Sequence, residues 1–438
     1  MLQNSVKINL PQYQNGHGVL GALPTEAMEW PLTESGKSSL ADLPVASVVK
    51  RSSELSPWQW PARPVFFVAD PHADAEAFIA SLEASGGVYR TGDKLHHIAL
   101  TAEGQRSTFI IGGDCLDKGP SNLALLRSIR TLKETGARVI LLAGNHDVRL
   151  LMGVRALGLS RHPATEHLFL RMGPKAVPLL REVYQQYLAG SGLEGVPPLS
   201  ECREQLYPSA NWFKAFPQLA ADVIPAKAVA KELKGMHKKM ACFEACCAEA
   251  GMDLRQVYAT AIKCRELFLQ PDGEFAWFFD SMQLIHREGS FLFVHAGLDD
   301  RFVALLAEKN EAYINTLYRE TIQSDLFGFY YGPLANTMRT KYRDVDMPLT
   351  EYGVEIAGRQ GLHAVVHGHR NRTNGQRIAL RQGMIHIEGD ITLDRNSRRK
   401  EGLRGYGMGV TIIRPEGRVI GISNDFPYAK VFEPQRYL

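Results

Sequence analysis

The chain has 438 residues, of which 45% are hydrophobic and 22% charged, a composition typical of a soluble globular protein long enough for more than one domain. The formal net charge of +3 is small for this length, so the charge balance argues against a nucleic-acid partner or an anionic membrane surface. No run of about 18 apolar residues occurs, and a transmembrane helix is therefore not expected.

The first sixty residues predict an arm rather than a folded unit. Residues 1–60 are rich in Gly, Pro, Ser and Asn, and their hydrophobic periodicity is weak. We expect this arm to lie across the core or to stay mobile, with Trp58 and Trp60 attaching it. A regulatory or partner-binding tail is the alternative. The arm lacks the apolar stretch of a secretory signal, and the six cysteines lack metal-ligand spacing, so we expect reduced thiols and a cytoplasmic location.

Polar side chains follow three predicted strands, in each case just after the strand ends. The strands are predicted at 64–69, 108–111 and 139–143 because these runs are apolar and rich in β-branched or aromatic residues. The polar groups are Asp70 and His72 after the first strand, Asp114 after the second, and Asn145 and His146 after the third. Open α/β sheets bind ligands at this edge. Oxygen and imidazole groups together predict a site for a hard to borderline metal ion.

Residues 151–289 interrupt the alternation of strands and helices. Helical periodicity is found at 175–188, 226–250 and 254–269, so we interpret the block as one helical insertion. Such an insertion would cover the active site and control substrate access, and a purely stabilising cap is the alternative. Cys242, Cys246 and Cys247 are expected to pack between helices, because no matching metal-ligand pairs occur.

The core resumes near residue 290. A strand leads to His295, residues 299–325 are expected to be helical, and the basic stretch 330–344 is expected to be a loop. Further strands are predicted at 362–367, 384–390, 407–413 and 418–423, the last ones at the spacing of hairpins.

Five motifs now occur in a fixed order, and together they resemble a known family. They are D-P-H at 70–72, G-D-C-L-D-K-G at 113–119, G-N-H-D at 144–147, H-A-G-L at 295–298 and V-V-H-G-H at 365–369. The set is similar to the calcineurin-like metallophosphoesterases, and in detail to the phosphoprotein-phosphatase branch and its bacterial serine/threonine phosphatase relatives. The resemblance implies an α/β fold, a β-sandwich flanked by helices. With the large helical insertion at 151–289, the core would comprise 61–150 and 290–438, preceded by the arm at 1–60.

The resemblance also implies a site with two divalent metal ions. The implied ligands are Asp70 and His72 for the first ion, Asp114 as the bridge, and Asn145, His295 and His369 for the second. A mixed set of this kind suits Mn²⁺ best, with Fe, Zn or Mg as alternatives.

His146 corresponds to the catalytic imidazole of the family, and Asp117 to the carboxylate that orients it. Lys118 stands where the family usually has an arginine, so it would contact phosphate as a point charge without a bidentate fork. Asn371 replaces a histidine found in other members, which would leave the first metal with few protein ligands. The first motif also lacks the glycines that usually flank its Asp and His.

Two choices stay open at this point. His369 is favoured over His367 as the ligand, because it matches the register of Gly368. Arg339 is the candidate for a further phosphate contact, and Arg343 is its competitor.

The implied activity is metal-dependent hydrolysis of phosphomonoesters by a metal-activated water, with His146 as general acid and a phosphoprotein or small phosphorylated molecule as the substrate. Hydrolysis of a dinucleoside polyphosphate or another nucleotide is the alternative. A non-catalytic scaffold of the same fold is more remote, because scaffolds typically lose the positions that are filled here. The only expected partner is the phosphorylated substrate.

Overall fold

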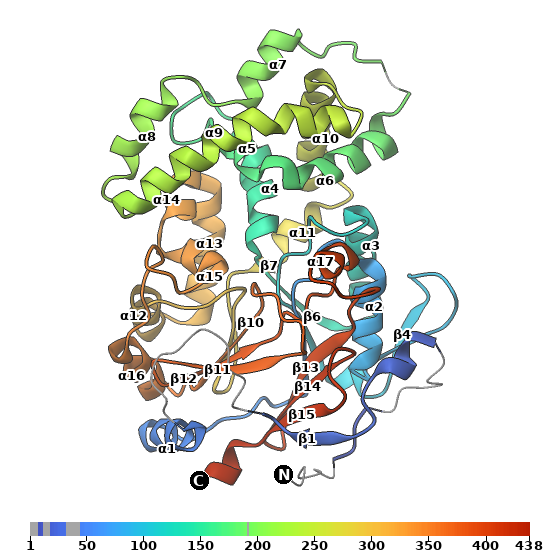
Figure 1. The fold of residues 1–438 in the computed structure, drawn as a ribbon, viewed down its shortest axis with the longest axis vertical. Helices are drawn as coiled ribbons and strands as arrows, with labels where there is room; N and C mark the ends of the chain where they lie inside the picture. Colours follow the sequence, from blue (N-terminus) through green and yellow to red (C-terminus); the bar gives the residue numbers. More distant parts are fainter. Residues whose placement is uncertain (1–7, 12–17, 32–43, 191) are drawn as a thin grey trace.

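Two β-sheets packed face to face form the centre of the protein (Figure 1). The computed structural model describes residues 8–11, 18–31, 44–190 and 192–438. The larger sheet has the strand order β1-β15-β14-β13-β2-β5-β6-β7, and the smaller has the order β11-β12-β10-β9-β8.

The larger sheet is mixed. Its strands are β1 (Ala27–Glu29), β2 (Val65–Val68), β5 (Thr108–Ile111), β6 (Arg138–Leu142), β7 (Met282–Gln283), β13 (Gly409–Arg414), β14 (Arg418–Ser423) and β15 (Ala429–Phe432). The segment β2-β5-β6 is parallel, and β13 joins β2 antiparallel. All four residues of β2 are buried, because one face of the sheet packs on the second sheet and the other on helices.

The smaller sheet completes a sandwich. Its strands are β8 (His286–Glu288), β9 (Phe291–Phe293), β10 (Ala364–His367), β11 (Arg377–Arg381) and β12 (Met384–Glu388), of which β9, β10 and β12 are parallel. Alternate residues of both sheets meet in one apolar cluster, in which the ring centroids of Phe67 and Phe293 are 5.8 Å apart. The predicted α/β sandwich is confirmed.

Helices cover the outer face of the larger sheet. They are α2 (Ala75–Ala84) and α3 (Asn122–Glu134), and beside them lies a small hairpin of β3 (Val88–Arg90) and β4 (Ile98–Leu100). Asp74 and Ser121 cap the two helices by accepting a hydrogen bond from a backbone N–H of the first turn.

The predicted helical block rises from the end of the sandwich at which the parallel strands of the larger sheet finish (Figure 1). Its helices are α4 (Asn145–Ala156), α5 (Leu168–Met172), α6 (Val177–Val183), α7 (Leu199–Leu206), α8 (Trp212–Ala220), α9 (Ala226–Glu249), α10 (Leu254–Leu269) and α11 (Ala276–Asp280). Both boundaries differ from the predicted 151 and 289. Helix α4 begins at Asn145 and continues through residue 151, and β7 and β8 lie in the two sheets of the core.

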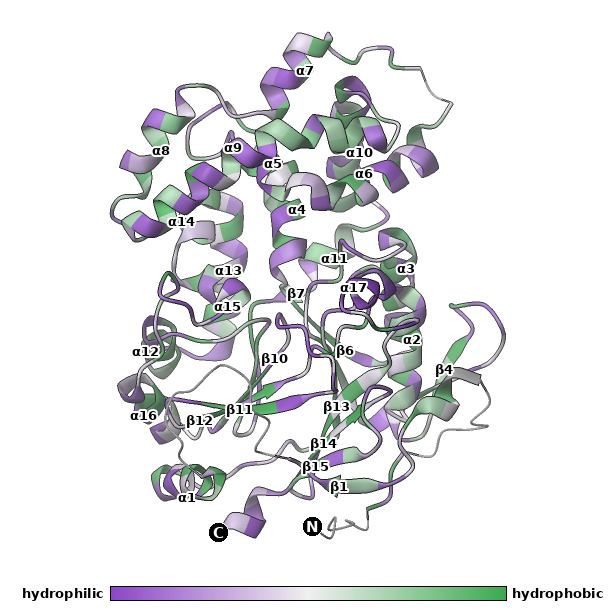
Figure 2. Ribbon diagram, in the orientation of Figure 1, coloured by the Kyte–Doolittle hydropathy of each residue, from purple (hydrophilic) through white to green (hydrophobic). Residues whose placement is uncertain are grey.

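Hydrophilic and hydrophobic positions alternate along these helices (Figure 2). The buried sides of these helices and the outer face of the larger sheet form one continuous apolar cluster. It contains Phe169, Phe216 and Phe243 of the block and Phe109 and Leu141 of the core. The helical block therefore packs against the core through a shared apolar interface.

Helices also follow the strand that leads to His295. They are α12 (Asp300–Glu308), α13 (Glu311–Ser324), α14 (Leu326–Tyr331), α15 (Pro333–Arg339), α16 (Glu351–Arg359) and α17 (Arg395–Lys400). The expectation of a loop at 330–344 is wrong for its first ten residues. Asp325 caps α14, and Pro333 occupies the first turn of α15, where its missing N–H costs no hydrogen bond. The stretch after Arg339 is irregular.

The described parts of the N-terminal arm are attached to the sandwich. Strand β1 pairs with β15 at the sheet edge, and α1 (Val45–Leu55) follows. Trp58 and Trp60 stack 6.0 Å apart and pack on Phe291 at 5.8 and 5.1 Å, as expected. The expectation of a mobile arm concerns residues 1–7, 12–17 and 32–43 as well, and these lie outside the described residues. Among the described helices, none has the length and hydropathy needed to span a membrane.

Candidate metal centre

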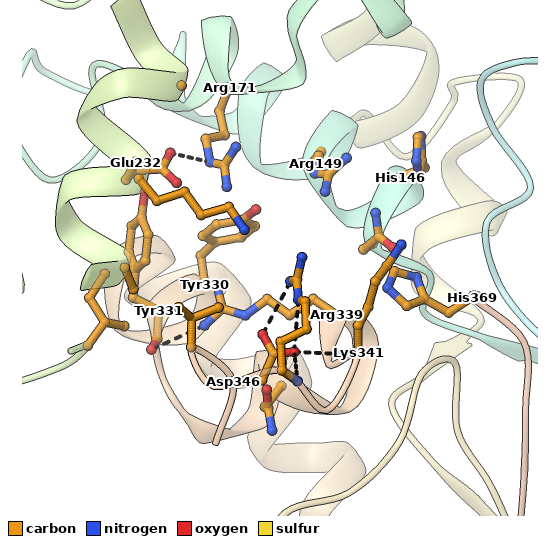
Figure 3. Close-up of a pocket in the computed structure, with 18 of the residues that line it drawn as sticks. His146, Arg149, Arg171, Glu232, Tyr330, Tyr331, Arg339, Lys341, Asp346 and His369 are labelled. Atoms are coloured by element: carbon orange, nitrogen blue, oxygen red, sulfur yellow. Dashed lines mark hydrogen bonds and ion pairs between the residues drawn. The ribbon is translucent and has the colours of Figure 1, made fainter. Parts of the chain in front are cut away.

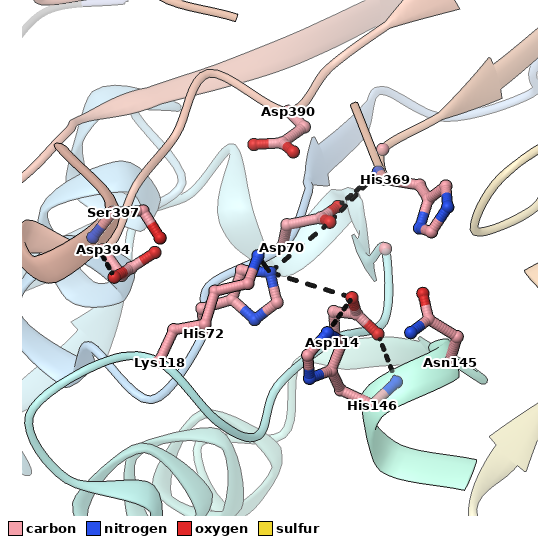
Figure 4. A network of polar contacts seen from close by, with 12 residues as sticks. Asp70, His72, Asp114, Lys118, Asn145, His146, His369, Asp390, Asp394 and Ser397 are labelled. Atoms are coloured by element: carbon pink, nitrogen blue, oxygen red, sulfur yellow. Dashed lines mark hydrogen bonds and ion pairs between the residues drawn. The ribbon is translucent and has the colours of Figure 1, made fainter. Parts of the chain in front are cut away.

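Strand ends of both sheets deliver metal-binding groups to one place (Figure 4). Asp70, His295 and His369 each lie two residues beyond the last residue of a strand, namely β2, β9 and β10. Their ligand atoms and those of neighbours form two groups, Asp70–His72–Asp114 and Asp114–His295–His369, with all atoms of a group within 4.8 Å of one another. Asp114 belongs to both groups, which is the arrangement of a bridging carboxylate.

The imidazoles point their free nitrogens to the centre of these groups. Nδ1 of His72 lies 3.1 Å from the carbonyl oxygen of Leu116, and Nδ1 of His295 lies 2.8 Å from that of Gly112. A carbonyl oxygen can only accept, so Nδ1 carries a proton and, in the neutral ring that binds a metal, Nε2 presents a lone pair. Nε2 of His72 lies 3.7 Å from Oδ2 of Asp114, and Nε2 of His295 lies 3.4 Å from Oδ1.

Two observations show that these residues fit cations. Nζ of Lys118 lies 2.5 Å from Nε2 of His72, so an ammonium group already stands at the position of a cation held by that ring. The Asn145 amide lies between the other two imidazoles, with Oδ1 3.3 Å from Nε2 of His295. Hydrogen bonding alone would turn its nitrogen toward Nδ1 of His369, at 2.8 Å. A cation between the two rings would instead favour the amide oxygen on that side.

The backbone around the site is strained at its ligands. Non-glycine residues with positive φ include Asp70 (47°), His72 (39°), Asp114 (51°), His369 (67°), and Asp117 and Lys118 (70° each). Such conformations cost about 1–3 kcal/mol each and persist where the surrounding structure holds them. So many strained residues at one place indicate that these loops are shaped to position the functional groups, at a cost in stability.

Because the site is buried, the protonation of each carboxyl and imidazole group in it depends on the charges of the neighbouring groups. Burial opposes the charged form of Asp114, but His295 and His146 outweigh burial and hold its pKa well below the usual value. Burial also disfavours the charged form of His295, yet the Asp114 and Asp70 carboxylates raise its pKa to about 10. Burial and the charge of Asp390 raise the pKa of Asp70 well above its usual value. Positive charge between these carboxylates would relieve their repulsion.

His146 lies beside Asp114 but takes part in neither donor group. It sits in the first turn of α4, where its backbone N–H donates to Oδ1 of Asp114 at 2.8 Å. Its Nδ1 lies 2.7 Å from Oδ2 of Asp117, which leaves Nε2 directed toward Asp114, 3.9 Å from Oδ2. Burial lowers the pKa of His146 well below its usual value and raises that of Asp117 to about 8. The pair therefore favours one shared proton over two separate charges.

A family comparison connects this geometry with known proteins. Residues 63–224 match the family described as calcineurin-like phosphoesterase. This segment of the chain is similar to a family of phosphoesterase enzymes, as its motifs predict. The matched residues include the first donor group and His146, whereas His295 and His369 come from the second sheet, beyond the match.

Solved structures with a similar chain path include three phosphatases. A mutant of a cold-active protein tyrosine phosphatase is 15% identical, covers 93% of this chain and 92% of its own, and gives a TM-score of 0.45. The cold-active protein tyrosine phosphatase of a psychrophilic Shewanella species is 14% identical, with 93% and 92% covered and a TM-score of 0.40. A protein serine/threonine phosphatase from Saccharomyces cerevisiae is 14% identical, with 89% and 90% covered and a TM-score of 0.36. No curated protein matches the sequence.

A basic cavity of about 470 Å³ opens over the donor groups (Figure 3). Four of its basic side chains come from the core: Lys118, Arg339, Lys341 and Arg343. Five more come from the helical block: Arg149, Arg171, Lys175, Lys231 and Lys239. The cavity is therefore suited to anionic ligands, with the metal-binding groups at one end of it.

The structure distinguishes the residues in both pairs that the sequence left open, His369 and His367, and Arg339 and Arg343. His369 belongs to a donor group, whereas His367 is buried with Nε2 3.3 Å from Nδ1 of His386. Arg339 and Arg343 both line the cavity, but Arg343 is bound by Asp346 at 3.3 Å. The guanidinium of Arg339 lies over the ring of Tyr330, 5.2 Å from its centroid, and has no carboxylate partner among the described residues.

Two residues near the site, Arg149 and Asp390, were not expected from the sequence. Arg149 is four residues after Asn145 on α4, so it lies on the same face of the helix and lines the cavity. Asp390 lies two residues beyond β12, the same offset that Asp70 has from β2. Burial raises the pKa of Asp390 to about 6, and its Oδ2 has no hydrogen-bond partner in the described part of the chain. The spacing of four residues from Asn145 on a helix could have predicted Arg149. The position two residues after a strand could have predicted Asp390.

Proposed function

We propose that this protein hydrolyses phosphomonoesters with the help of two divalent metal ions. Asp70 and His72 would hold the first ion, Asp114 both ions, and Asn145, His295 and His369 the second. The observation that supports this proposal most is the pair of donor groups that share Asp114. The mixture of carboxylate, amide and imidazole favours Mn²⁺ over Mg²⁺, with Fe and Zn as alternatives.

When bound, the ions supply Lewis acidity toward the phosphoryl group and an activated water. The protein supplies the proton. Nε2 of His146 lies 3.9 Å from Oδ2 of Asp114, on the side of the donor groups, and would donate a proton to the leaving oxygen. Asp117 holds Nδ1 at 2.7 Å and thereby fixes the orientation of the ring. A phosphate dianion in the cavity would favour the protonated form of this imidazole.

Cationic side chains near the donor groups would bind the remaining phosphoryl oxygens. Lys118, Arg149 and Arg339 line the cavity, and no carboxylate lies within 4.0 Å of any of them among the described residues. Lys118 would move away from His72 when a cation binds there, because the two positive charges repel. It would then be free to contact phosphate.

The substrate could be a phosphoprotein or a small phosphorylated molecule, with a dinucleoside polyphosphate or another nucleotide as the alternative. A cytoplasmic location stays a prediction from cysteine usage.

The test is a phosphatase assay with added Mn²⁺ over p-nitrophenyl phosphate, phosphopeptides and nucleotides. We expect hydrolysis of p-nitrophenyl phosphate that requires metal. Absence of any hydrolysis across the panel, with metal bound, would favour the scaffold alternative.

A further inference from the structure

The basic cavity extends well beyond the metal-binding groups. Its far wall is formed by α9, which contributes Ala228, Lys231, Glu232, Gly235 and Lys239. These residues recur at intervals of three or four, so they form one face of the helix. Helix α9 therefore presents a continuous stripe to the cavity.

Gly235 at the middle of this stripe opens the space. A Cβ built at Gly235 would meet no atom within 4 Å. Glycine inside a helix costs about 1 kcal/mol relative to alanine. The helix thus carries its least favourable residue at the position where any side chain would project into the cavity, with a lysine one turn away on each side.

The cationic charge of the cavity exceeds what its carboxylates neutralise. Apart from Asp70 and Asp114, the lining carboxylates are Glu232, which lies 2.6 Å from Arg171, and Asp346, which binds Arg343. Within the described residues, the other seven lining basic side chains have no carboxylate within 4.0 Å. Burial and the charge of Arg171 lower the pKa of Lys239 to about 6, so a bound anion would favour its charged form. Lys118, Arg149 and Arg339 suffice for one phosphate at the metals. The lysines of the far wall are left without a role in the proposed reaction.

Arg171 and Arg339 link the two ends of the cavity. Each guanidinium carbon lies 5.2 Å from the centroid of the Tyr330 ring. Figure 3 shows Arg171 above the Tyr330 ring, Arg339 below it and Arg149 on the side of His146. Glu232 forms an ion pair with Arg171, and Lys239 donates to the backbone oxygen of Arg171. The polar side chains of the far wall are therefore held in position by contacts with one another.

We propose that this far wall binds a second phosphate group of the substrate, so that the enzyme acts on small molecules carrying two or more phosphates. The proposal deepens the proposed function and rests on it. The volume of about 470 Å³ lies in the range of small-molecule sites, about 300–1,000 Å³. A cavity walled by α9 on one side and by α14 and α15 on the other favours a small ligand over an extended segment of a protein.

The first arm of the test compares substrates that differ only in the second phosphate. A ladder of alkanediol bisphosphates of increasing length is assayed beside the matching alkyl monophosphates, in the metal-loaded full-length protein. At least one bisphosphate should have a KM about tenfold or more below that of its monophosphate, since a charge-assisted hydrogen bond contributes about 1.5–3 kcal/mol. A doubly phosphorylated peptide is included beside its singly phosphorylated form.

The second arm uses lysines of the same helix as matched variants. The double variant K231A/K239M removes two cavity-lining amino groups, and K234A/K238A removes two exposed amino groups of α9 that do not line it. The ratio of KM values, monophosphate over bisphosphate, should fall about tenfold in the first variant. It should be unchanged in the second. A cooperative melt of both variants is required before the assay.

Gly235 supplies a variant that alters shape without altering charge. Gly235→Ala should keep the bisphosphate preference, whereas Gly235→Phe should abolish it by filling the space beside the two lysines. Monophosphate hydrolysis without any bisphosphate preference would overturn the inference and leave the proposed function standing. No hydrolysis of either class would count against the proposed function itself. A preference confined to the doubly phosphorylated peptide would overturn the small-molecule assignment.

Discussion

Nδ1 of His146 lies 2.7 Å from Oδ2 of Asp117, and both side chains are buried. The carboxylate comes from the loop after β5 and the imidazole from the first turn of α4, so the contact joins two adjacent βα connections of the larger sheet. It leaves Nε2 as the only ring nitrogen that can meet a substrate. The roles of His146 and Asp114 can therefore be separated by experiment.

Replacing His146 with Asn should lower kcat by about 10²–10⁴-fold while the metal content stays that of the unaltered protein, because the ring would donate a proton but bind no ion. Asp114→Asn should reduce the metal content as well as the turnover, because its carboxylate belongs to both donor groups. Elemental analysis beside the turnover number distinguishes the two variants. Equal metal loss in both would contradict the assignment of His146.

Activity should depend on added divalent metal, with Mn²⁺ more effective than Mg²⁺. Imidazole and amide ligands beside carboxylates suit Mn²⁺ better than Mg²⁺, which prefers all-oxygen sites. Protein treated with a chelator is given single metals and assayed with p-nitrophenyl phosphate. Full activity of the metal-free protein would contradict this prediction. If Mg²⁺ restored as much activity as Mn²⁺, the predicted preference for Mn²⁺ would be wrong.

Arg339→Ala should raise the KM for p-nitrophenyl phosphate by about tenfold, and Arg343→Ala should raise it much less. Arg339 has no carboxylate partner among the described residues, whereas the charge of Arg343 is shared with Asp346. Steady-state kinetics of the two variants test the difference directly. A larger effect at Arg343 would exchange the roles of the two arginines.

Deleting residues 151–289 should abolish folding, although every proposed metal ligand lies outside this range. The deletion removes the last residues of α4, both strands β7 and β8, and a large part of the apolar cluster that covers the larger sheet. Exposing that face would cost far more than the net stability of a typical domain, about 5–15 kcal/mol. Thermal unfolding followed by circular dichroism checks this. A cooperative melt of the deleted protein would show that the core folds by itself.

His286 should make the stability of the protein fall in mildly alkaline solution. Its Nδ1 lies 2.8 Å from Glu311 of α13, and its Nε2 lies 3.1 Å from Glu288. Burial alone would lower the pKa of His286, but the hydrogen bonds to Glu288 and Glu311 outweigh burial and raise the pKa to about 9. A histidine with a raised pKa stabilises the folded state fully below its unfolded value of 6.5 and loses this contribution as pH rises through about 9.

The expected loss is about 1–2 kcal/mol, because both carboxylates are partly exposed and solvent screens them. Urea unfolding below pH 6.5 and above pH 9 measures it, with His286→Gln as the control that lacks the titrating group. The control should lack this part of the pH dependence. An identical pH dependence in both proteins would rule out His286 as its source.

The sequence by itself determined the central strands and the residues that gather at their ends. Short apolar β-branched runs followed by Asp70, Asp114 and Asn145 are local signals, since a buried strand and the loop after it are encoded within a few residues. The long helices α9 and α10 were predicted for the same reason. Local signals failed at α15, where Pro333 and the basic residues resembled a loop although the helix packs into the core.

Only the tertiary structure decided which groups share a site. His367 is the last residue of β10 and packs beside His386, whereas His369 lies two residues further on, in a donor group. The left-handed backbone at His369 turns its side chain away from the path of the strand. Arg171 and Lys239 gave no signal, since they meet the cavity only after α5 and α9 fold over the strand ends. A cavity wall depends on contacts between residues far apart in the chain, and no local pattern encodes those contacts.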